Sequence, residues 1–290
     1  MIDRLEIRQM NRQEVDDLVS WAAQEGWNPG IHDAEIFWQT DADAFMAAEL
    51  DGELVGGGAV TSYDREFGFM GFFIVRPQFR SRGLGNTLWH VRLARLRDRL
   101  QPGASIGMDG VFEMQSYYAK GGFVFSHRNI RYRAEVPGNS SPAEGGDDQI
   151  VPINSVPFDQ LAEYDRTCFP APRPTFLRAW TTQADGLALG CLRQGKLSGY
   201  GVVRRCPEGF KMGPLFADDF QAASDLYEHL ANFAAGGPVF LDVPENNASA
   251  LELVQRNQMV EVFGCARMYI GGVPDISHQR VFGVTTFELG

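Results

Sequence analysis

Residues 73–86 constrain the fold of this chain more than any other part of the sequence. They read Phe-Ile-Val-Arg-Pro-Gln-Phe-Arg-Ser-Arg-Gly-Leu-Gly-Asn, an apolar run that passes through a Pro into a turn rich in Arg and Gly. Pro77 lacks an N–H, so we expect the strand to end there. Gly83 and Gly85 permit backbone conformations and a close ligand approach that a Cβ would block. The segment predicts a strand, a glycine turn and a helix in direct succession.

The helix after this turn is predicted from its apolar spacing over residues 84–100. The first N–H groups of a helix lack intrahelical partners, and the helix dipole favours an anion at that end. Arg80 and Arg82 add positive charge. An oligophosphate is the expected ligand. The Walker and Rossmann patterns fit poorly, because the chain has no Gly-Lys-Ser/Thr and the third glycine of Gly-x-Gly-x-x-Gly is missing.

Two short motifs resemble those of the GNAT N-acetyltransferase superfamily. Arg80-Ser-Arg-Gly-Leu-Gly85 matches the Arg/Gln-x-x-Gly-x-Gly/Ala signature of motif A, with the usual Val-x-Pro lead-in before it. Tyr118-Ala-Lys-Gly-Gly-Phe123 resembles the Tyr-x-x-x-Gly-Phe of motif B. The helix and the strand expected near residues 104–109 fit a right-handed crossover between two parallel strands.

The resemblance implies that acetyl-CoA is the co-substrate, with its pantetheine arm added beside the strand at residues 72–75 in the manner of an extra strand. It also implies Tyr118 as the general acid near sulfur, since a phenol is protonated at neutral pH. The expected cofactor-binding residues are Phe73, Ile74, Val75, Arg80, Ser81, Arg82, Gly83, Leu84, Gly85 and Asn86.

The general base and the acceptor contacts are less well defined by the sequence. Asp109, at the end of a predicted parallel strand, is a candidate base or substrate contact, and Asp64, Glu113 and His127 are alternatives. A carboxylate in such a position is more often a helix cap, a turn residue or a solvated charge, and a lone histidine in a strand is usually structural. An exposed Trp27 with Asn28 and Asp33 would hold an amine by cation–π and hydrogen-bonding contacts. The alternative is a turn fixed by a buried Trp.

The second half of the chain repeats the first at an offset of 136 residues. Residues 118–123 align with 254–259 and residues 130–132 with 266–268, and each copy follows an apolar strand that ends in Asp109 or Asp242. Asp218 and Asp219 replace the Arg- and Gly-rich turn, and these carboxylates would repel phosphates. The chain therefore resembles tandem GNAT proteins of the YitH-like group, with one working domain.

The expected fold class is α/β (α+β), with two GNAT-like domains. Each would have a mixed, mostly antiparallel sheet, one parallel strand pair and flanking helices. The Pro-, Gly- and acid-rich residues 136–148 are the predicted linker, between a catalytic domain at 1–135 and a degenerate domain at 149–290.

Composition limits the partners. The 290 residues contain 26 Lys and Arg against 37 Asp and Glu, a net charge of −11, which disfavours nucleic acid and anionic membranes. No long apolar run is present, and the four cysteines lack Cys-x-x-Cys spacing. The five histidines lack metal-ligand spacing. We expect a cytoplasmic protein, monomeric or homodimeric, that needs no metal.

The sequence therefore predicts an acetyl-CoA-dependent N-acetyltransferase that acts by direct attack of a primary amine, in a small molecule or an amino-acid derivative. Direct attack is preferred over a covalent enzyme intermediate, because all four cysteines lie in the second half of the chain, which lacks the Arg- and Gly-rich turn. Two alternatives stay open: a non-catalytic acyl-CoA sensor, and an N-acetyltransferase of proteins or peptides.

Overall fold

A computed structural model describes residues 4–138 and 148–290. Most of the predicted linker therefore lies outside the described residues, and the domain boundaries stay a prediction. The strands are β1 Leu5–Gln9, β2 Phe45–Leu50, β3 Glu53–Tyr63, β4 Phe67–Val75, β5 Ser105–Val111, β6 Val124–Glu135, β7 Asp148–Pro152, β8 Gly186–Arg193, β9 Lys196–Arg205, β10 Phe210–Ala217, β11 Pro238–Pro244, β12 Val260–Ile270 and β13 Val281–Gly283.

The helices match the apolar periodicity of the sequence. They are α1 Arg12–Gln24, α2 Asp33–Thr40, α3 Leu84–Arg99, α4 Gln115–Lys120, α5 Phe158–Cys168, α6 Pro174–Thr181, α7 Phe220–Phe233 and α8 Ala248–Arg256. Single turns of 3₁₀ helix are η1 Ala42–Ala44, η2 Pro77–Phe79, η3 Phe112–Met114, η4 Ile153–Ser155 and η5 His278–Arg280. Asn11 begins α1 with a capping box, and Asp219 caps α7.

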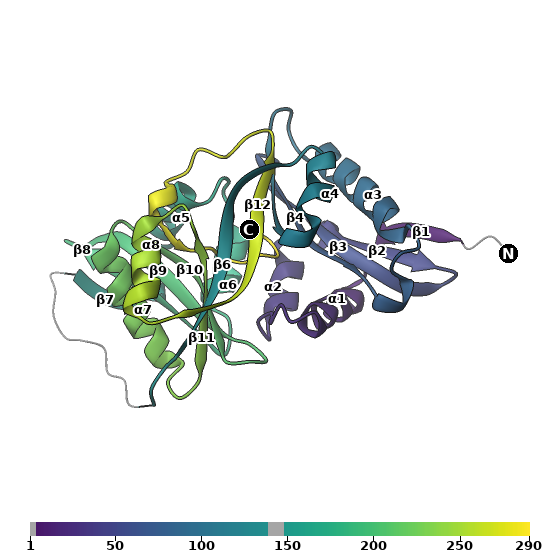
Figure 1. Cartoon of the computed structure of the whole chain (residues 1–290). Helices are drawn as coiled ribbons and strands as arrows, with labels where there is room; N and C mark the ends of the chain where they lie inside the picture. Colours follow the sequence, from purple (N-terminus) through teal and green to yellow (C-terminus); the bar gives the residue numbers. More distant parts are fainter. Residues whose placement is uncertain (1–3, 139–147) are drawn as a thin grey trace.

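The predicted fold class is confirmed. The strands form one mostly antiparallel sheet in the order β1-β2-β3-β4-β5-β12-β6-β11-β10-β9-β8-β7, and β13 pairs with β10. Each half contains one parallel pair, β4 with β5 and β10 with β11, as the crossover through α3 or α7 requires. The repeat in the sequence is thus a repeat of structure, and the two halves lie side by side in Figure 1.

The two halves exchange their last strands, which the sequence reasoning missed. β12 from the second half pairs with β5 of the first, whereas β6 from the first half pairs with β11 of the second. β6 and β12 also pair with each other and join the two half-sheets (Figure 1). Hydrophobic patterning predicts that a strand exists but does not choose between two similar edges.

Buried ion pairs accompany the exchange at equivalent positions of the repeat. Arg267 on β12 binds Asp109 on β5 with two hydrogen bonds, of 2.9 and 2.6 Å. Arg131 on β6 binds Asp242 on β11 in the same way, at 2.6 and 2.8 Å. Each arginine therefore ties its strand to an aspartate of the other half.

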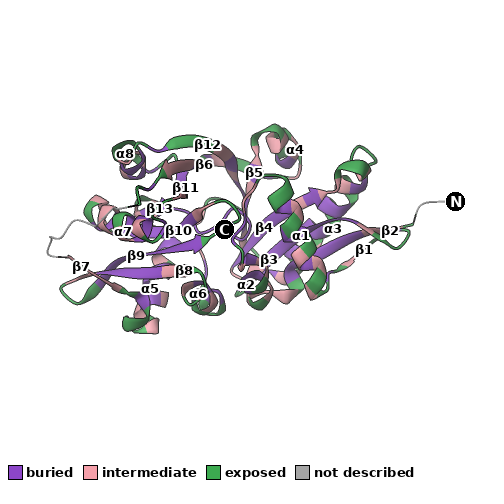
Figure 2. Ribbon diagram, turned by 90° about the horizontal axis from the view of Figure 1, so that it is seen from below, coloured by how far each residue is buried: buried purple, intermediate pink, exposed green. Residues whose placement is uncertain are grey.

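Helices cover the sheet in both halves, and their outer faces are exposed while the strands are largely buried (Figure 2). In the first half, Trp89, Leu93 and Leu96 of α3 pack with Val60 and Met70. In the second half, α7 and α8 pack on β9, β10 and β11. Another apolar cluster joins α1 and α2 to α5 and α6 across the boundary between the halves.

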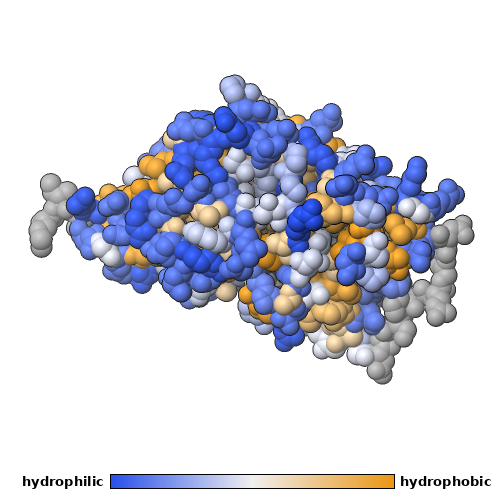
Figure 3. Space-filling model, turned by 180° about the vertical axis from the view of Figure 1, so that it is seen from behind, coloured by the Kyte–Doolittle hydropathy of each residue, from blue (hydrophilic) through white to orange (hydrophobic). Residues whose placement is uncertain are grey.

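Hydrophilic residues dominate the surface seen in Figure 3, with smaller hydrophobic patches among them. Among the described residues, none of the helices has the length and apolar character needed to cross a membrane.

Candidate active site

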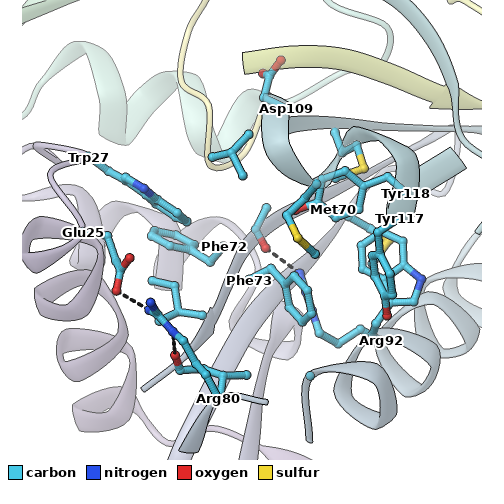
Figure 4. A pocket seen from close by; sticks show the side chains of 18 of the residues that line it. Glu25, Trp27, Met70, Phe72, Phe73, Arg80, Arg92, Asp109, Tyr117 and Tyr118 are labelled. Carbon is cyan, nitrogen blue, oxygen red and sulfur yellow. Dashed lines mark hydrogen bonds and ion pairs between the residues drawn. The ribbon is translucent and has the colours of Figure 1, made fainter. Parts of the chain in front are cut away.

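The two parallel strands of the first half separate where the sequence turns into the glycine loop. β4 and β5 pair only from Phe67 to Phe69 and from Ser105 to Gly107. Beyond that point a cavity of about 630 Å³ opens between them, and its lining runs from the glycine turn to residues of the second half (Figure 4). The free edge of β4 therefore faces an open space, as the resemblance implied.

The predicted glycine turn lies at one end of this cavity. Ser81 and Gly83 have positive φ angles of 62° and 81°, and Gly83 is the N-cap residue of α3. This conformation leaves the first N–H groups of α3 without intrahelical acceptors. Nine of the ten predicted cofactor-binding residues line the cavity: Phe73, Ile74, Val75, Arg80, Ser81, Gly83, Leu84, Gly85 and Asn86.

The two arginines of the turn differ in their surroundings. Arg80 donates to the Val75 carbonyl at 2.7 Å and forms an ion pair with Glu25 of α1 (Figure 4). It therefore fixes the end of β4 to the neighbouring helix. The guanidinium of Arg82 lies 5.7 Å from the centre of the Phe79 ring, and Arg82 is not among the residues that line the cavity.

A β-bulge in β4 marks the middle of the cavity. The register between β3 and β4 shifts at Gly58 and Ala59, and the extra residue opposite them is Phe72, with a φ of 38°. A non-glycine residue with a positive φ is strained, and such strain persists only where the surroundings hold it. The bulge turns the backbone of β4 within the stretch, Met70 to Val75, that lines the cavity.

Arg92 of α3 holds this bulge, and the sequence reasoning did not single it out. Its side chain is fully buried and lines the cavity. Nη2 donates to the carbonyl of Gly71 at 2.5 Å (Figure 4). It also donates to the carbonyl of Ala59 at 2.6 Å. Nε and Nη1 have no hydrogen-bond partner among the described residues. Burial lowers the pKa of the guanidinium to about 9.

A signal for Arg92 was present in the sequence. It lies one helical turn from Leu88 and Leu96, on the buried face of α3. A Cβ on Gly58 would stand 2.4 Å from Cζ of Arg92, so this glycine makes room for the guanidinium. An arginine within an apolar helix face, together with a Gly-Gly-Gly strand, is the pattern that could have revealed it.

Tyr118 lies in the cavity wall, and its predicted role as general acid stays a prediction. Its ring stacks on Trp89, with centroids 5.1 Å apart, and covers Gly110 so closely that a Cβ there would stand 2.3 Å from the ring. Burial raises the pKa of the phenol to about 12, and the positive charge of Arg92 opposes that rise. The neighbouring Tyr117 instead donates its hydroxyl proton to Asn86, at 3.2 Å.

The carboxylate of Asp109 is already engaged. Besides the two bonds from Arg267, it accepts one from Asn129 at 2.8 Å, and Figure 4 shows it pointing away from Phe72 and Tyr118. Asp109 lines the cavity, whereas Asp64 and Glu113 do not. His127 lines a separate, smaller cavity. A catalytic role for Asp109 stays a prediction.

Of the three predicted substrate contacts near the start of α2, one lines the cavity and two form contacts between the two halves of the chain. Trp27 lines the cavity and stacks on Phe72, with centroids 6.4 Å apart. Asn28 exchanges two hydrogen bonds with the backbone of Glu208. Asp33 is fully buried and binds Arg204 at 2.9 and 3.2 Å. The structure does not bring Asn28 and Asp33 to the cavity, so their predicted substrate contacts lack support.

The equivalent gap in the second half is filled by the chain itself. β10 and β11 pair from Phe210 to Met212 and then separate, and β13 lies in the opening, paired with β10. Val284 donates to the Asp242 carbonyl of β11 at 2.8 Å. At the start of α7, Asp219 caps the helix and binds Arg193. Because of β13 and the capped start of α7, the described part of the second half lacks an open cavity equivalent to the one beside β4.

The strand exchange also changes the position of one cysteine. Cys265 of β12 lines the cavity, although it is far from the glycine turn in the sequence. Burial raises the pKa of its thiol well above the usual value. Within residues 4–138 and 148–290, His, Cys, Asp and Glu form no group suited to hold a metal ion.

Comparisons with known proteins agree with this architecture. The Acetyltransferase (GNAT) family profile matches residues 12–123, and a second Acetyltransferase (GNAT) domain profile matches residues 161–283. Holothin acyltransferase of Pseudoalteromonas is 27% identical over 93% of this chain and 89% of its own length. The uncharacterised N-acetyltransferase YitH of Bacillus subtilis is 21% identical over 84% of each chain.

Solved structures share the fold of the whole chain. A candidate acetyltransferase from Pyrococcus horikoshii superposes with a TM-score of 0.82 at 24% identity, and the match covers 99% of this chain and 96% of that one. A tandem GNAT protein from the clavulanic acid biosynthesis pathway has a TM-score of 0.65 at 14% identity, over 94% and 100% of the two chains.

Proposed function

This chain belongs to the GNAT acetyltransferase superfamily and carries two of its domains in tandem, and we propose that the first domain is an acetyl-CoA-dependent N-acetyltransferase. The acceptor would be the primary amine of a small molecule or an amino-acid derivative. The observation that carries the proposal is the single cavity that joins the glycine turn, the Phe72 bulge and Tyr118. The name of the Pseudoalteromonas relative, an acyltransferase, supports the reaction class.

The glycine turn would bind the pyrophosphate of the co-substrate. The uncapped N–H groups at the start of α3 and the helix dipole favour an anion there. Arg80 lines the same end, and its hydrogen bond to Val75 sets the distance between the turn and β4. The free edge of β4, from Phe73 to Val75, would pair with the pantetheine arm.

The Phe72 bulge would bind the carbonyl oxygen of the thioester. Acetyl-CoA, when bound, supplies the thioester carbon that the amine attacks. Backbone N–H groups after a bulge point away from the ladder and can stabilise a developing oxyanion. Arg92 is the positioning residue: it fixes the Gly71 carbonyl and adds positive charge in a dry environment, where charge acts strongly.

Tyr118 would donate a proton to the sulfur of CoA as the C–S bond breaks. It would recover a proton from the nitrogen of the new amide. The raised pKa of Tyr118 keeps its phenol protonated at neutral pH. Burial makes the phenol a weaker acid, and the positive charge of Arg92 opposes that effect. Direct attack of the amine is favoured, because Cys265, the cysteine in the cavity wall, is held as a neutral thiol.

The test is release of free thiol from acetyl-CoA in the presence of a panel of amines. Tyr118→Phe should reduce kcat by about 100-fold or more, the usual contribution of a general acid. The matched control Tyr117→Phe removes a hydroxyl that contacts Asn86 and should keep kcat within about threefold. Unchanged kcat in Tyr118→Phe would make the proton donor wrong and favour the sensor alternative.

Arg92 is tested by Arg92→Met, which keeps most of the buried volume. The expected result is a fall in kcat of about tenfold or more, with a smaller change in KM for acetyl-CoA, because the residue acts in the transition state. Arg92→Lys should recover part of the loss through its charge. If kcat falls no further than the loss of folded protein explains, and Arg92→Lys recovers no activity, Arg92 has only a packing role.

A further inference from the structure

We propose that the end of the cavity opposite the glycine turn is the acceptor subsite, and that it takes a primary amine carried on a flat, apolar body. We define this acceptor subsite by Trp27, Phe72, Phe263, Phe287 and Glu288, all of which line the cavity. Glu288 is the group that holds the acceptor ammonium and takes its proton. The inference rests on the proposed acetyl transfer, since it assigns the second substrate of that reaction.

The acceptor subsite is assembled from three segments that are remote in the sequence. Trp27 precedes α2, Phe263 comes from the exchanged strand β12, and Phe287 and Glu288 lie in the tail after β13. The tail approaches β4 beside the bulge, because a Cβ on Gly71 would stand only 1.4 Å from the Glu288 carbonyl oxygen. Glu288 is thereby fixed next to the place where the thioester carbonyl would bind.

The aromatic side chains of the acceptor subsite form two stacked or tilted pairs. Trp27 and Phe72 lie 25° from parallel, and Phe263 and Phe287 have ring centroids 6.1 Å apart. The guanidinium of Arg131 lies 5.6 Å from the Phe263 centroid and 4.9 Å from the Phe287 centroid. Its ion pair with Asp242 holds that guanidinium in place. Rigid ring faces suit a flat apolar body.

Glu288 differs from the other carboxylates of the cavity. Glu25 is paired with Arg80, and Asp109 with Arg267. Glu288 is 2% exposed, and its Oε2 has no hydrogen-bond partner among the described residues. Of the three acidic residues that line the cavity, Glu288 is thus the one that forms no ion pair within the described residues, and a ligand ammonium can take that place.

The charges around Glu288 come from both halves of the chain. They are Lys211, Arg131 and Arg204, which favour its ionised form, and Asp33, which opposes it. Burial outweighs them and raises the pKa of the carboxyl. A carboxylate with a raised pKa is a better proton acceptor than an exposed one.

The protons of the reaction then balance. The ammonium gives one proton to Glu288, which later passes it to solvent, and the free amine attacks the thioester carbon. The C–N bond forms and the C–S bond breaks. Sulfur takes the proton of Tyr118, and Tyr118 recovers the second proton from nitrogen. The third proton stays on the amide.

The arrangement argues against a polycationic acceptor. A polyamine needs several free carboxylates, whereas two of the three acidic residues in the cavity lining are already paired with arginines. Tryptamine and 2-phenylethylamine represent the flat-bodied class, and spermidine represents the polycations. The wild-type chain should acetylate at least one flat-bodied amine with a kcat/KM ten times that for spermidine or more.

Glu288→Gln tests the carboxylate with little change of shape. We expect kcat/KM for the preferred flat-bodied amine to fall at least 100-fold, while the Kd for acetyl-CoA stays within threefold. The matched control is Glu261→Gln, an exposed glutamate on the same strand as Phe263, and it should leave both values unchanged. Activity of Glu288→Gln within threefold of wild type overturns the role of Glu288.

Trp27→Leu provides an independent test if Glu288→Gln unfolds. It should raise KM for the flat-bodied amine at least tenfold and leave the Kd for acetyl-CoA within threefold; an unchanged KM overturns the acceptor subsite. If the chain binds acetyl-CoA but acetylates only spermidine, or none of the three amines, the flat-bodied acceptor class is refuted. The binding of acetyl-CoA then still stands. Absence of acetyl-CoA binding by the wild-type chain would instead refute the proposed function itself.

Discussion

The structural role of the buried ion pair between Asp109 and Arg267 can be tested by comparison with the equivalent pair, Asp242 and Arg131. Asp109→Asn keeps the shape of the side chain and removes the charge that faces Arg267. Asp242→Asn does the same to Arg131, but Asp242 is not among the residues that line the cavity. If Asp109 is structural, both substitutions should destabilise the chain alike, and Asp109→Asn should leave the chemistry of the folded enzyme intact.

The size of the effect follows from burial. The side chains of Arg267 and Arg131 are 11% and 3% exposed, so each would be left as a buried charge without its partner. Breaking such a pair costs about 3–5 kcal/mol. Asn can still accept one hydrogen bond, which places Asp109→Asn near the lower limit. With an unfolding entropy of about 2.1 cal/mol/K per residue, we expect Tm to fall by roughly 5 °C.

The assays are urea and thermal unfolding followed by circular dichroism, and thiol release at a temperature where every variant is folded. We expect kcat of Asp109→Asn within about threefold of wild type. In the double variant Asp109→Asn with Arg267→Met, at least half of the lost stability should return, because no unpaired charge remains. An unchanged Tm together with a kcat about 100-fold lower would refute this reasoning and make Asp109 a catalytic base.

Two further perturbations test the bulge and the acid. Gly58→Ala should lower the free energy of unfolding by about 1–3 kcal/mol and reduce kcat, because the new Cβ would stand 2.3 Å from the carbonyl oxygen of Phe72 and 2.4 Å from Cζ of Arg92. Gly138→Ala, where a Cβ would meet open space, is the control. Equal stability of the two variants would contradict the packing around the bulge. Because the pKa of Tyr118 is raised to about 12, its proton is retained up to pH 10. A fall in kcat between pH 8 and pH 10 should therefore come from Arg92, whose pKa is lowered to about 9, and should be absent in Arg92→Met. An alkaline fall in that range that persists in Arg92→Met and is absent in Tyr118→Phe would refute the raised pKa of Tyr118.

Much of the fold could be predicted from the sequence because its signals are local. The helix expected over residues 84–100 corresponds to α3, Leu84–Arg99, and the strand expected near residues 104–109 corresponds to β5, Ser105–Val111. The glycine turn was recognisable because a positive φ at Gly83 and an uncapped helix start require a particular local sequence.

The parts that escaped prediction depend on contacts between the halves. β6 and β12 have similar patterns and either could pair with either half-sheet, so the exchange left no mark in the periodicity. Asp33 was predicted as a substrate contact, but it binds Arg204, a residue far away in the sequence that only the folded chain brings beside it. Glu288 lies in a short tail without periodicity, and only the approach of that tail to Gly71 brings it to the cavity.

The central claim is that the chain has two GNAT domains and one acetyl-CoA site, in the first domain. Titration calorimetry with acetyl-CoA tests it most directly. We predict one molecule bound per wild-type chain, and none in Gly83→Asp, which places a carboxylate and a strained backbone at the start of α3. Gly236→Asp, at a φ of 89° in the second half, controls for strain and charge and should still bind one. Two molecules per chain, or undiminished binding in Gly83→Asp, would contradict the account.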